Sequence, residues 1–177
     1  MTTFKPADIA SVTPKLPLQL RAAAPHITVI GHAMLDGWWF GSTERVCQEA
    51  PAPVVELRRR QYAAGGAANT AMNLAAMGAR VRLVGLIGED EAGATLCRLL
   101  ESAHIDISGL ISTPEIATVT KTRVVSQDQI LLRLDDVAHF EYPHSLQADL
   151  RNAAAVGVAG ADALIVCDYG CGGLQSR

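Results

Sequence analysis

The chain has 177 residues, 49% of them hydrophobic, which is enough for the core of one globular domain and excludes a disordered chain. Its formal net charge of −3 argues against a nucleic-acid-binding groove, since such grooves are normally basic. Residues 1–25 contain four prolines and no long apolar run, so we expect a flexible N-terminal arm and neither a signal peptide nor a membrane span. The cysteines are scattered and fit no strong zinc pattern, which predicts reduced thiols in a cytoplasmic protein without a metal site.

The first half of the chain alternates strand and helix patterns. A β-branched run over residues 26–32 predicts a strand, and the aromatic, glycine-containing segment 34–41 after it reads as turn-rich. Residues 53–60 predict a second strand, whose closing arginine run indicates a solvated strand end. A helix is expected over about residues 67–77, ended by Gly78 as a C-terminal cap.

The second half continues the alternation. Residues 80–88 form an apolar run typical of a buried strand, and Asp90 is placed to cap the helix that follows. Residues 106–135 hold three strand-like runs, of which the last two predict a hairpin. A helix over about residues 145–158 then leads to the apolar run 161–167, which is typical of an interior parallel strand.

These strand–helix–strand units predict an α/β fold with a mostly parallel sheet, interrupted by an all-β insertion that forms a small covering sheet. In open α/β sheets, ligands bind outside the carboxyl ends of the strands. Asp36, Asp168 and the turn at residues 88–90 all follow predicted strands, and a covering sheet would exclude water from that crevice. No GxGxxG follows the first strand and no GxxxxGK[ST] occurs, which disfavours a dinucleotide fold and a P-loop enzyme.

The segment AAGGAANTAMNLAAMG, residues 63–78, places two glycines before an Ala-rich helix. Gly65 and Gly66 can adopt positive φ and let another group approach closely, which suits a polyhydroxyl or anionic ligand at a helix start. Asn69 offers both amide donors and a carbonyl acceptor. The residues alone leave two interpretations open: Asn69 is a ligand-binding side chain, or it is a local helix cap.

Two motifs carry a family resemblance. The stretch GGAANTA, followed by Gly78 and Gly88, resembles the N-terminal signature of the ribokinase/PfkB carbohydrate kinases, and GEDEAG resembles their GxDxxG element. Within that family, the chain from residue 26 to its end is similar to the D-glycero-beta-D-manno-heptose-7-phosphate kinase domain of lipopolysaccharide-core biosynthesis. The stretches that carry this likeness are GHAMLDGWWFG, EAPAPVVEL, GGAANTAMNLAAMGA, VRLVGLIGEDEAG, TKTRVVS, LLRLD and DYGCGGL.

The resemblance implies a ribokinase-like three-layer fold with a β-sheet lid, here truncated after its N-terminal half. Residues 26–177 would be the N-terminal part of the kinase domain, with lid segments at about residues 37–62 and 107–135. The implied reaction is transfer of the ATP γ-phosphate to a hydroxyl of a sugar phosphate, with Mg²⁺ assisting. The implied partner is a second copy of the chain, bound through the lid.

The resemblance also assigns binding residues. Asp36, Gly65, Gly66 and Asn69 match family positions that hold the sugar, which favours the ligand-binding interpretation of Asn69.

Three further candidates are less specific. Lys121 and Arg123 lie two apart on a predicted strand and so face one side, where they could bind the phosphate that the sugar already carries. The alternative for this pair is a solvated lid edge. Asp168 could orient Mg²⁺ or phosphate, or it could be only a turn residue. Of the aromatic residues 38–40, two of the three are expected to pack in the lid.

The chain also departs from the family pattern. His32 stands where close relatives usually have Asp, Gly37 where they usually have Arg, and Cys171 where they usually have Lys. The family's GAGD-type anion hole and catalytic base have no counterpart, so we expect no catalytic residue and poor ATP and Mg²⁺ binding by this chain alone. Two functions stay open: the sugar-binding half of a kinase, or a non-catalytic remnant or split-enzyme subunit that binds a sugar phosphate or a C-terminal partner chain.

Overall fold

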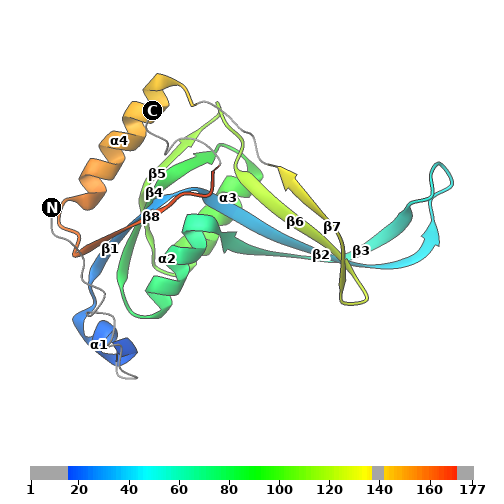
Figure 1. Ribbon diagram of the computed structural model, residues 1–177, viewed down its shortest axis with the longest axis horizontal. Coiled ribbons are helices and arrows are strands. Elements are labelled where there is room, and N and C mark those ends of the chain that lie inside the picture. Colours follow the sequence, from blue (N-terminus) through cyan, green and yellow to red (C-terminus); the bar gives the residue numbers. More distant parts are fainter. Residues whose placement is uncertain (1–15, 137–141, 171–177) are drawn as a thin grey trace.

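The chain folds into a parallel sheet with helices on both faces and a second, mixed sheet that projects away from it (Figure 1). The computed structural model describes residues 16–136 and 142–170. The parallel sheet has the strand order β5-β4-β1-β8, and the second sheet, which we call the lid, has the order β3-β2-β6-β7. The elements are α1 (Leu16–Ala23), β1 (His26–Gly31), β2 (Ala33–Val46), β3 (Pro53–Gly65), α2 (Gly66–Ala76), β4 (Arg80–Gly88), α3 (Glu91–Ser102), β5 (Asp106–Thr113), β6 (Val119–Ser126), β7 (Gln129–Asp136), α4 (His144–Val158) and β8 (Ala163–Cys167). The predicted α/β class with a mostly parallel sheet is confirmed.

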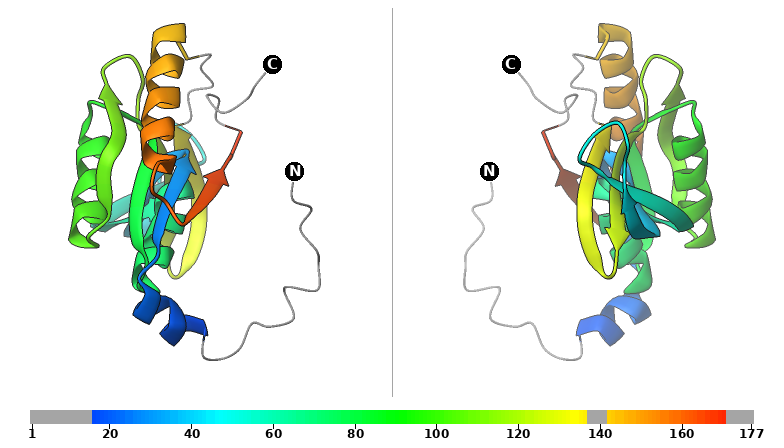
Figure 2. Two further views of the ribbon diagram at one scale, coloured as in Figure 1. Left: turned by 90° about the vertical axis from the view of Figure 1, so that its left-hand side faces the viewer. Right: turned by 90° about the vertical axis from the view of Figure 1, so that its right-hand side faces the viewer.

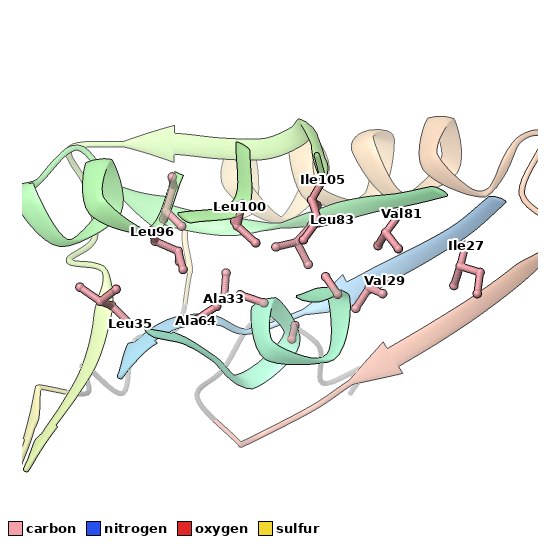
Figure 3. Close-up of a cluster of buried hydrophobic side chains, with 14 residues drawn as sticks. Ile27, Val29, Ala33, Leu35, Ala64, Val81, Leu83, Leu96, Leu100 and Ile105 are labelled. Carbon is pink, nitrogen blue, oxygen red and sulfur yellow. The ribbon is translucent and has the colours of Figure 1, made fainter. Parts of the chain in front are cut away.

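The hydrophobic core lies between the parallel sheet and the pair α2 and α3 (Figure 3). Val29 and Leu83 from the sheet and Leu96 and Leu100 from α3 are fully buried there. The buried face of α2 consists of small side chains, which lets that helix lie close to the strands. These are Ala67, Ala68 and Ala71. A smaller cluster on the opposite face packs α4 against the sheet and completes three layers.

The segment 34–41, expected to be turn-rich, is instead part of the long strand β2. Residues 34–41 of β2 pair with β3 on one side and with β6 on the other, so their backbone is held in a ladder rather than in a turn. Gly41 is needed where the β2–β3 register shifts, since a Cβ there would lie 2.5 Å from the carbonyl oxygen of Glu56. The aromatic and glycine residues therefore form a strand with an irregularity.

Two expected domain limits change. The segment 107–113, expected in the lid, belongs to β5, the edge strand of the parallel sheet, so the later part of the lid consists of β6 and β7. Periodicity identifies strands but does not determine which sheet they join. Within the expected N-terminal arm, residues 16–23 form α1, whose Arg21 donates a hydrogen bond to the carbonyl of Ala76 at 3.4 Å. The rest of that arm, residues 1–15, lies outside the described residues.

The β6–β7 hairpin forms as predicted. Gln127 and Asp128 both have positive φ, 49° and 62°, as a two-residue hairpin turn requires. β4 and β5 are joined at their starts by an ion pair, with Arg82 Nε 2.7 Å from Asp106 Oδ2. Burial alone would raise the pKa of Asp106, but hydrogen bonds from Ser108 and Arg82 outweigh it and hold that pKa below its ordinary value.

β8 has an apolar sequence typical of an interior strand, yet among the described strands it pairs with β1 alone. It therefore forms the outer edge of the parallel sheet (Figure 2). Leu164 and Val166, whose register partners are Thr28 and Ile30, keep 45% and 59% of their surface exposed. An unpaired strand edge with exposed apolar side chains favours association with another chain.

Candidate functional site

The site lies where β1, β8 and the start of α2 meet, and His32 joins all three. The carbonyl of His32 accepts a hydrogen bond from Ala67 N at 2.9 Å, and its Nδ1 accepts one from Tyr169 N at 3.1 Å. Its side chain is only 6% exposed, and Nδ1 lies 3.6 Å from Asp168 Oδ1. In the sequence, His32 stands out only as a departure from the family pattern. Its place at the carboxyl end of the first strand was the signal that could have identified it.

The double glycine at the start of α2 is required by close contacts on both sides. Gly66 has φ +55°, and a Cβ there would lie 2.4 Å from the carbonyl oxygen of His32. A Cβ at Gly65 would lie 2.8 Å from Asp36 Oδ2. The turn therefore brings the backbone directly against the Asp36 carboxylate, which no larger residue would permit.

Asn69 is not a helix cap. The N-cap of α2 is Gly65, which makes no side-chain cap hydrogen bond, and Asn69 lies one turn further on with an exposed side chain. Its carbonyl oxygen accepts from Asn73 Nδ2 at 2.9 Å, and its Oδ1 lies 3.3 Å from the same nitrogen. The capping alternative is therefore wrong, and ligand binding by Asn69 stays a prediction.

Asp36 and Arg123 form an ion pair at the base of the lid. Arg123 Nη1 donates to Asp36 Oδ1 at 2.9 Å and to the carbonyl of Lys121 at 3.1 Å, and the guanidinium lies 4.8 Å from the ring centroid of Trp38. The Arg123 and Asp36 side chains are 21% and 22% exposed, so water screens the pair only partly. A guanidinium has five N–H donors, so Arg123 retains donors for a ligand beside Asp36.

Lys121 lies on the same lid face as this pair. Asp36 and Lys121 are register partners across β2 and β6, as are Trp38 and Arg123. Lys121 Nζ is 4.0 Å from Asp135 Oδ2, a carboxylate that the neighbouring Arg133 already binds at 2.7 and 2.8 Å. The structure thus brings together Asp36, Lys121, Arg123 and the double glycine.

The arginine run expected to be a solvated strand end is exposed, but it lies within β3 rather than at its end, beside the aromatic residues of β2. The Arg60 guanidinium lies 5.0 Å from the Trp39 ring centroid, and that of Arg59 lies 4.3 Å from Phe40. These cation–π contacts cover the rings from outside. Trp39 and Phe40 therefore belong to lid packing.

Asp168 lies just after β8, with its side chain 45% exposed. Its Oδ1 accepts a hydrogen bond from Gly170 N at 2.8 Å, which forms a local turn. Cys171 lies outside the described residues. In the part of the chain that the structure describes, no three or more His, Cys, Asp or Glu residues gather in a way that could hold a metal ion.

Most of the chain matches a known protein family. Residues 24–172 match the model of the pfkB family of carbohydrate kinases. The bifunctional protein HldE of Actinobacillus succinogenes is 46% identical over 161 residues, which are 89% of this chain and 33% of that protein. HldE of Histophilus somni is 46% identical over 151 residues, 84% of this chain and 31% of that protein. The chain therefore spans about a third of the length of these curated relatives.

Solved structures with this fold are more distant in sequence. A carbohydrate kinase from Agrobacterium tumefaciens superposes with a TM-score of 0.66 at 22% identity, covering 80% of this chain and 45% of that one. Arabidopsis thaliana ribokinase, complexed with ribose and ATP, superposes with a TM-score of 0.53 at 17% identity, covering 80% and 53%. Among the described helices, none is long and apolar enough to cross a membrane. The ribokinase-like fold is confirmed, and the chain belongs to the pfkB family of carbohydrate kinases.

Proposed function

We propose that this chain forms the sugar-binding part of a carbohydrate kinase whose acceptor is a sugar phosphate, heptose 7-phosphate. The observation that carries the proposal is the Asp36–Arg123 ion pair, held at 2.9 Å against the Gly65–Gly66 turn. It places a carboxylate that accepts hydrogen bonds from hydroxyl groups beside a cation that binds anions. The likeness to HldE and to the heptose-7-phosphate kinase domain supports this choice of sugar.

Each element of the site has a part in holding the acceptor. Asp36 accepts hydrogen bonds from sugar hydroxyls, and Asn69 both donates to them and accepts from them. α2 begins without a side-chain cap, so the N–H groups of its first turn, apart from that of Ala67, which donates to His32, can serve an oxygen-rich ligand. Lys121 and the remaining donors of Arg123 bind the phosphate that the sugar carries.

We propose that the whole protein, of which this chain covers a part, uses ATP as its phosphoryl donor. ATP as phosphoryl donor is supported by family membership and by the ATP-bound Arabidopsis ribokinase, which shares the fold. Asp168, at the carboxyl end of β8, would lie on the phosphate side of the site. The chain by itself binds and orients the acceptor, and we expect no phosphoryl transfer by these 177 residues alone.

The lid is also the proposed contact between two copies of the chain. β7 is exposed along its length, including four large apolar side chains. These are Ile130, Leu131, Leu132 and Leu134. Their burial against a second lid would remove apolar surface from water.

Isothermal titration calorimetry of the 177-residue chain, first with heptose 7-phosphate and then with unphosphorylated heptose, tests the proposal. We expect saturable binding that is stronger for the phosphorylated sugar. Equal affinity for the two sugars would exclude the phosphate site, and binding of neither would exclude the function. A coupled assay for ADP, with ATP and heptose 7-phosphate, accompanies the titration. ADP release that depends on the sugar would show that this chain also catalyses the transfer.

A further inference from the structure

The lid is joined to the β4–α3 turn by a hydrogen-bonded contact that we call the clasp. It consists of Asp90 and Thr118, together with Gly88 and Gly93 on either side of Asp90. Asp90 Oδ1 accepts from Gly93 N at 2.7 Å, and Oδ2 accepts from Thr118 N at 2.8 Å. The Thr118 hydroxyl in turn accepts from Gly88 N at 2.9 Å. Two hydrogen bonds thus join the β4–α3 turn to Thr118, the residue that precedes β6, and the third, from Gly93 N, caps α3 within the turn.

The two glycines allow this contact to close. A Cβ at Gly88 would lie 2.5 Å from Asp90 Oδ2 and 2.8 Å from Thr118 N. A Cβ at Gly93 would lie 2.4 Å from the carbonyl oxygen of Gly88 and 2.9 Å from Thr118 Oγ1. The glycines of the GEDEAG segment therefore leave the space in which Thr118 packs, and the Asp90 side chain of the same segment caps α3.

Thr118 is buried in the clasp, at 2% exposed, whereas Asp90 lies at the surface. The contact keeps the Asp90 carboxylate charged. Burial alone would raise the pKa of Asp90, but the N–H groups of Thr118 and Gly93 donate to the carboxylate and hold that pKa below its ordinary value. Hydrogen bonds to a charged acceptor are stronger than those between neutral groups, so the contact is well suited to fix an orientation.

The clasp stands at the base of the strand that carries the cations of the site. Val119, the next residue, makes the first rung of the β2–β6 ladder with Met34, and Lys121 and Arg123 follow on the same strand. At about 3.3 Å per residue, Arg123 lies roughly 17 Å along β6 from Thr118. A change of about 10° in strand direction at the base would move Arg123 by about 3 Å, more than a hydrogen bond tolerates.

We infer that the Asp90–Thr118 clasp is a positioning device that holds β6, and with it Lys121 and Arg123, in register with the Gly65–Gly66 turn. Neither Asp90 nor Thr118 has to touch the ligand for this role. The inference rests on the proposed function for its binding readout. Its structural readout, the protection of lid amides from hydrogen exchange, is independent of any ligand.

The test compares four variants of the full chain by hydrogen–deuterium exchange and by calorimetry with heptose 7-phosphate. Thr118→Val removes the hydroxyl acceptor and keeps the side-chain shape, whereas Thr118→Ser keeps the hydroxyl. Asp90→Asn removes one of the two carboxylate acceptors. Thr120→Val, two residues along the same strand, is the matched control.

We expect Thr118→Val to raise the exchange rates of the amides in residues 119–136 about tenfold, together with that of Gly88, which loses its acceptor, while those of β1 and of the rest of β4 stay unchanged. Sugar-phosphate affinity should fall by a similar factor, and Thr118→Ser and Thr120→Val should behave like the wild type. If Thr118→Val does not fold, Asp90→Asn provides the same comparison. Faster exchange spread evenly over both sheets, or no change in the lid, would overturn the inference.

The two readouts separate the clasp from the proposed function. If the wild type binds no sugar phosphate while Thr118→Val still loosens the lid, the proposed function fails and the clasp stands as the lid anchor. If the wild type binds and Thr118→Val binds equally well, the clasp has no positioning role.

Discussion

Asn69→Ala provides the sharpest test of the sugar site because the structure separates its effect on binding from its effect on folding. Asn69 is exposed one turn into α2, and the helix is not capped by its side chain. A sugar hydroxyl left without its partner costs about 1–3 kcal/mol, which corresponds to a loss of about 5- to 150-fold in affinity. That loss should appear in the Kd for the sugar phosphate.

Stability should respond in a different way. Alanine has the higher helix propensity, by up to about 0.7 kcal/mol, and the contact with Asn73 that disappears is solvent-exposed. The free energy of unfolding should therefore stay within about 0.5 kcal/mol of the wild-type value. A variant that folds normally but binds poorly is the expected result.

Calorimetry and denaturant unfolding measure these two quantities on the same samples. Asn73→Ala is the matched control, since Asn73 lies on the same helix face one turn further on and is also exposed. Its Kd should stay close to the wild-type value. Unchanged affinity in Asn69→Ala, or equal losses in both variants, would refute sugar binding by Asn69. A lowered melting temperature in Asn69→Ala alone would point to a structural role instead.

Three further predictions concern charge and the sheet edge. Lys121→Glu should weaken binding of the phosphorylated sugar about tenfold or more and leave binding of the unphosphorylated sugar unaffected. Arg123→Glu should weaken binding of both sugars because it also removes the partner of Asp36. Equal effects of Lys121→Glu on both sugars would show that Lys121 is a lid-surface residue and does not bind the phosphate. The depressed pKa of Asp106 stabilises the fold at pH values above its ordinary value of 3.8, and this contribution is lost as pH falls through the folded-state pKa. Asp106→Asn should therefore lower the free energy of unfolding at pH 7 and lose that effect in acid; a pH-independent difference would exclude this origin. The double substitution Leu164→Lys and Val166→Lys should reduce self-association of the chain, measured by light scattering, because both side chains are exposed at the β8 edge. Unchanged self-association would show that the chains associate through another surface.

Local features of the sequence predicted much of the fold. The apolar run over β4 and the capping Asp90 identified a strand and a helix start because both depend on neighbouring residues only. The β6–β7 turn was predictable for the same reason. The assignment of β5 to the parallel sheet was missed because its pairing with β4 depends on the whole fold.

Individual residues of the site could be predicted from the sequence, but the contacts between them could not. The double glycine could be recognised as a turn that admits a close neighbour, but that neighbour is Asp36, about thirty residues earlier. Likewise Arg123 was predicted either to bind phosphate or to lie at a solvated lid edge, and its ion pair with Asp36 on the adjacent strand β2 was not predicted. Such pairs form only when the lid assembles, so no local pattern contains them.

Each of the two glycine-containing motifs lies at a point where the lid adjoins the rest of the fold. Gly65 and Gly66 join β3 to α2 against the carbonyl of His32, and the GEDEAG segment receives Thr118 at the base of β6. Asp36 and Arg123, the charged pair of the proposed site, lie further along the strands that these two anchors hold. The two motifs therefore position the lid relative to the parallel sheet. The lid in turn positions the residues proposed to bind the sugar. A residue can then be essential for recognition without touching the ligand, as we expect for Thr118.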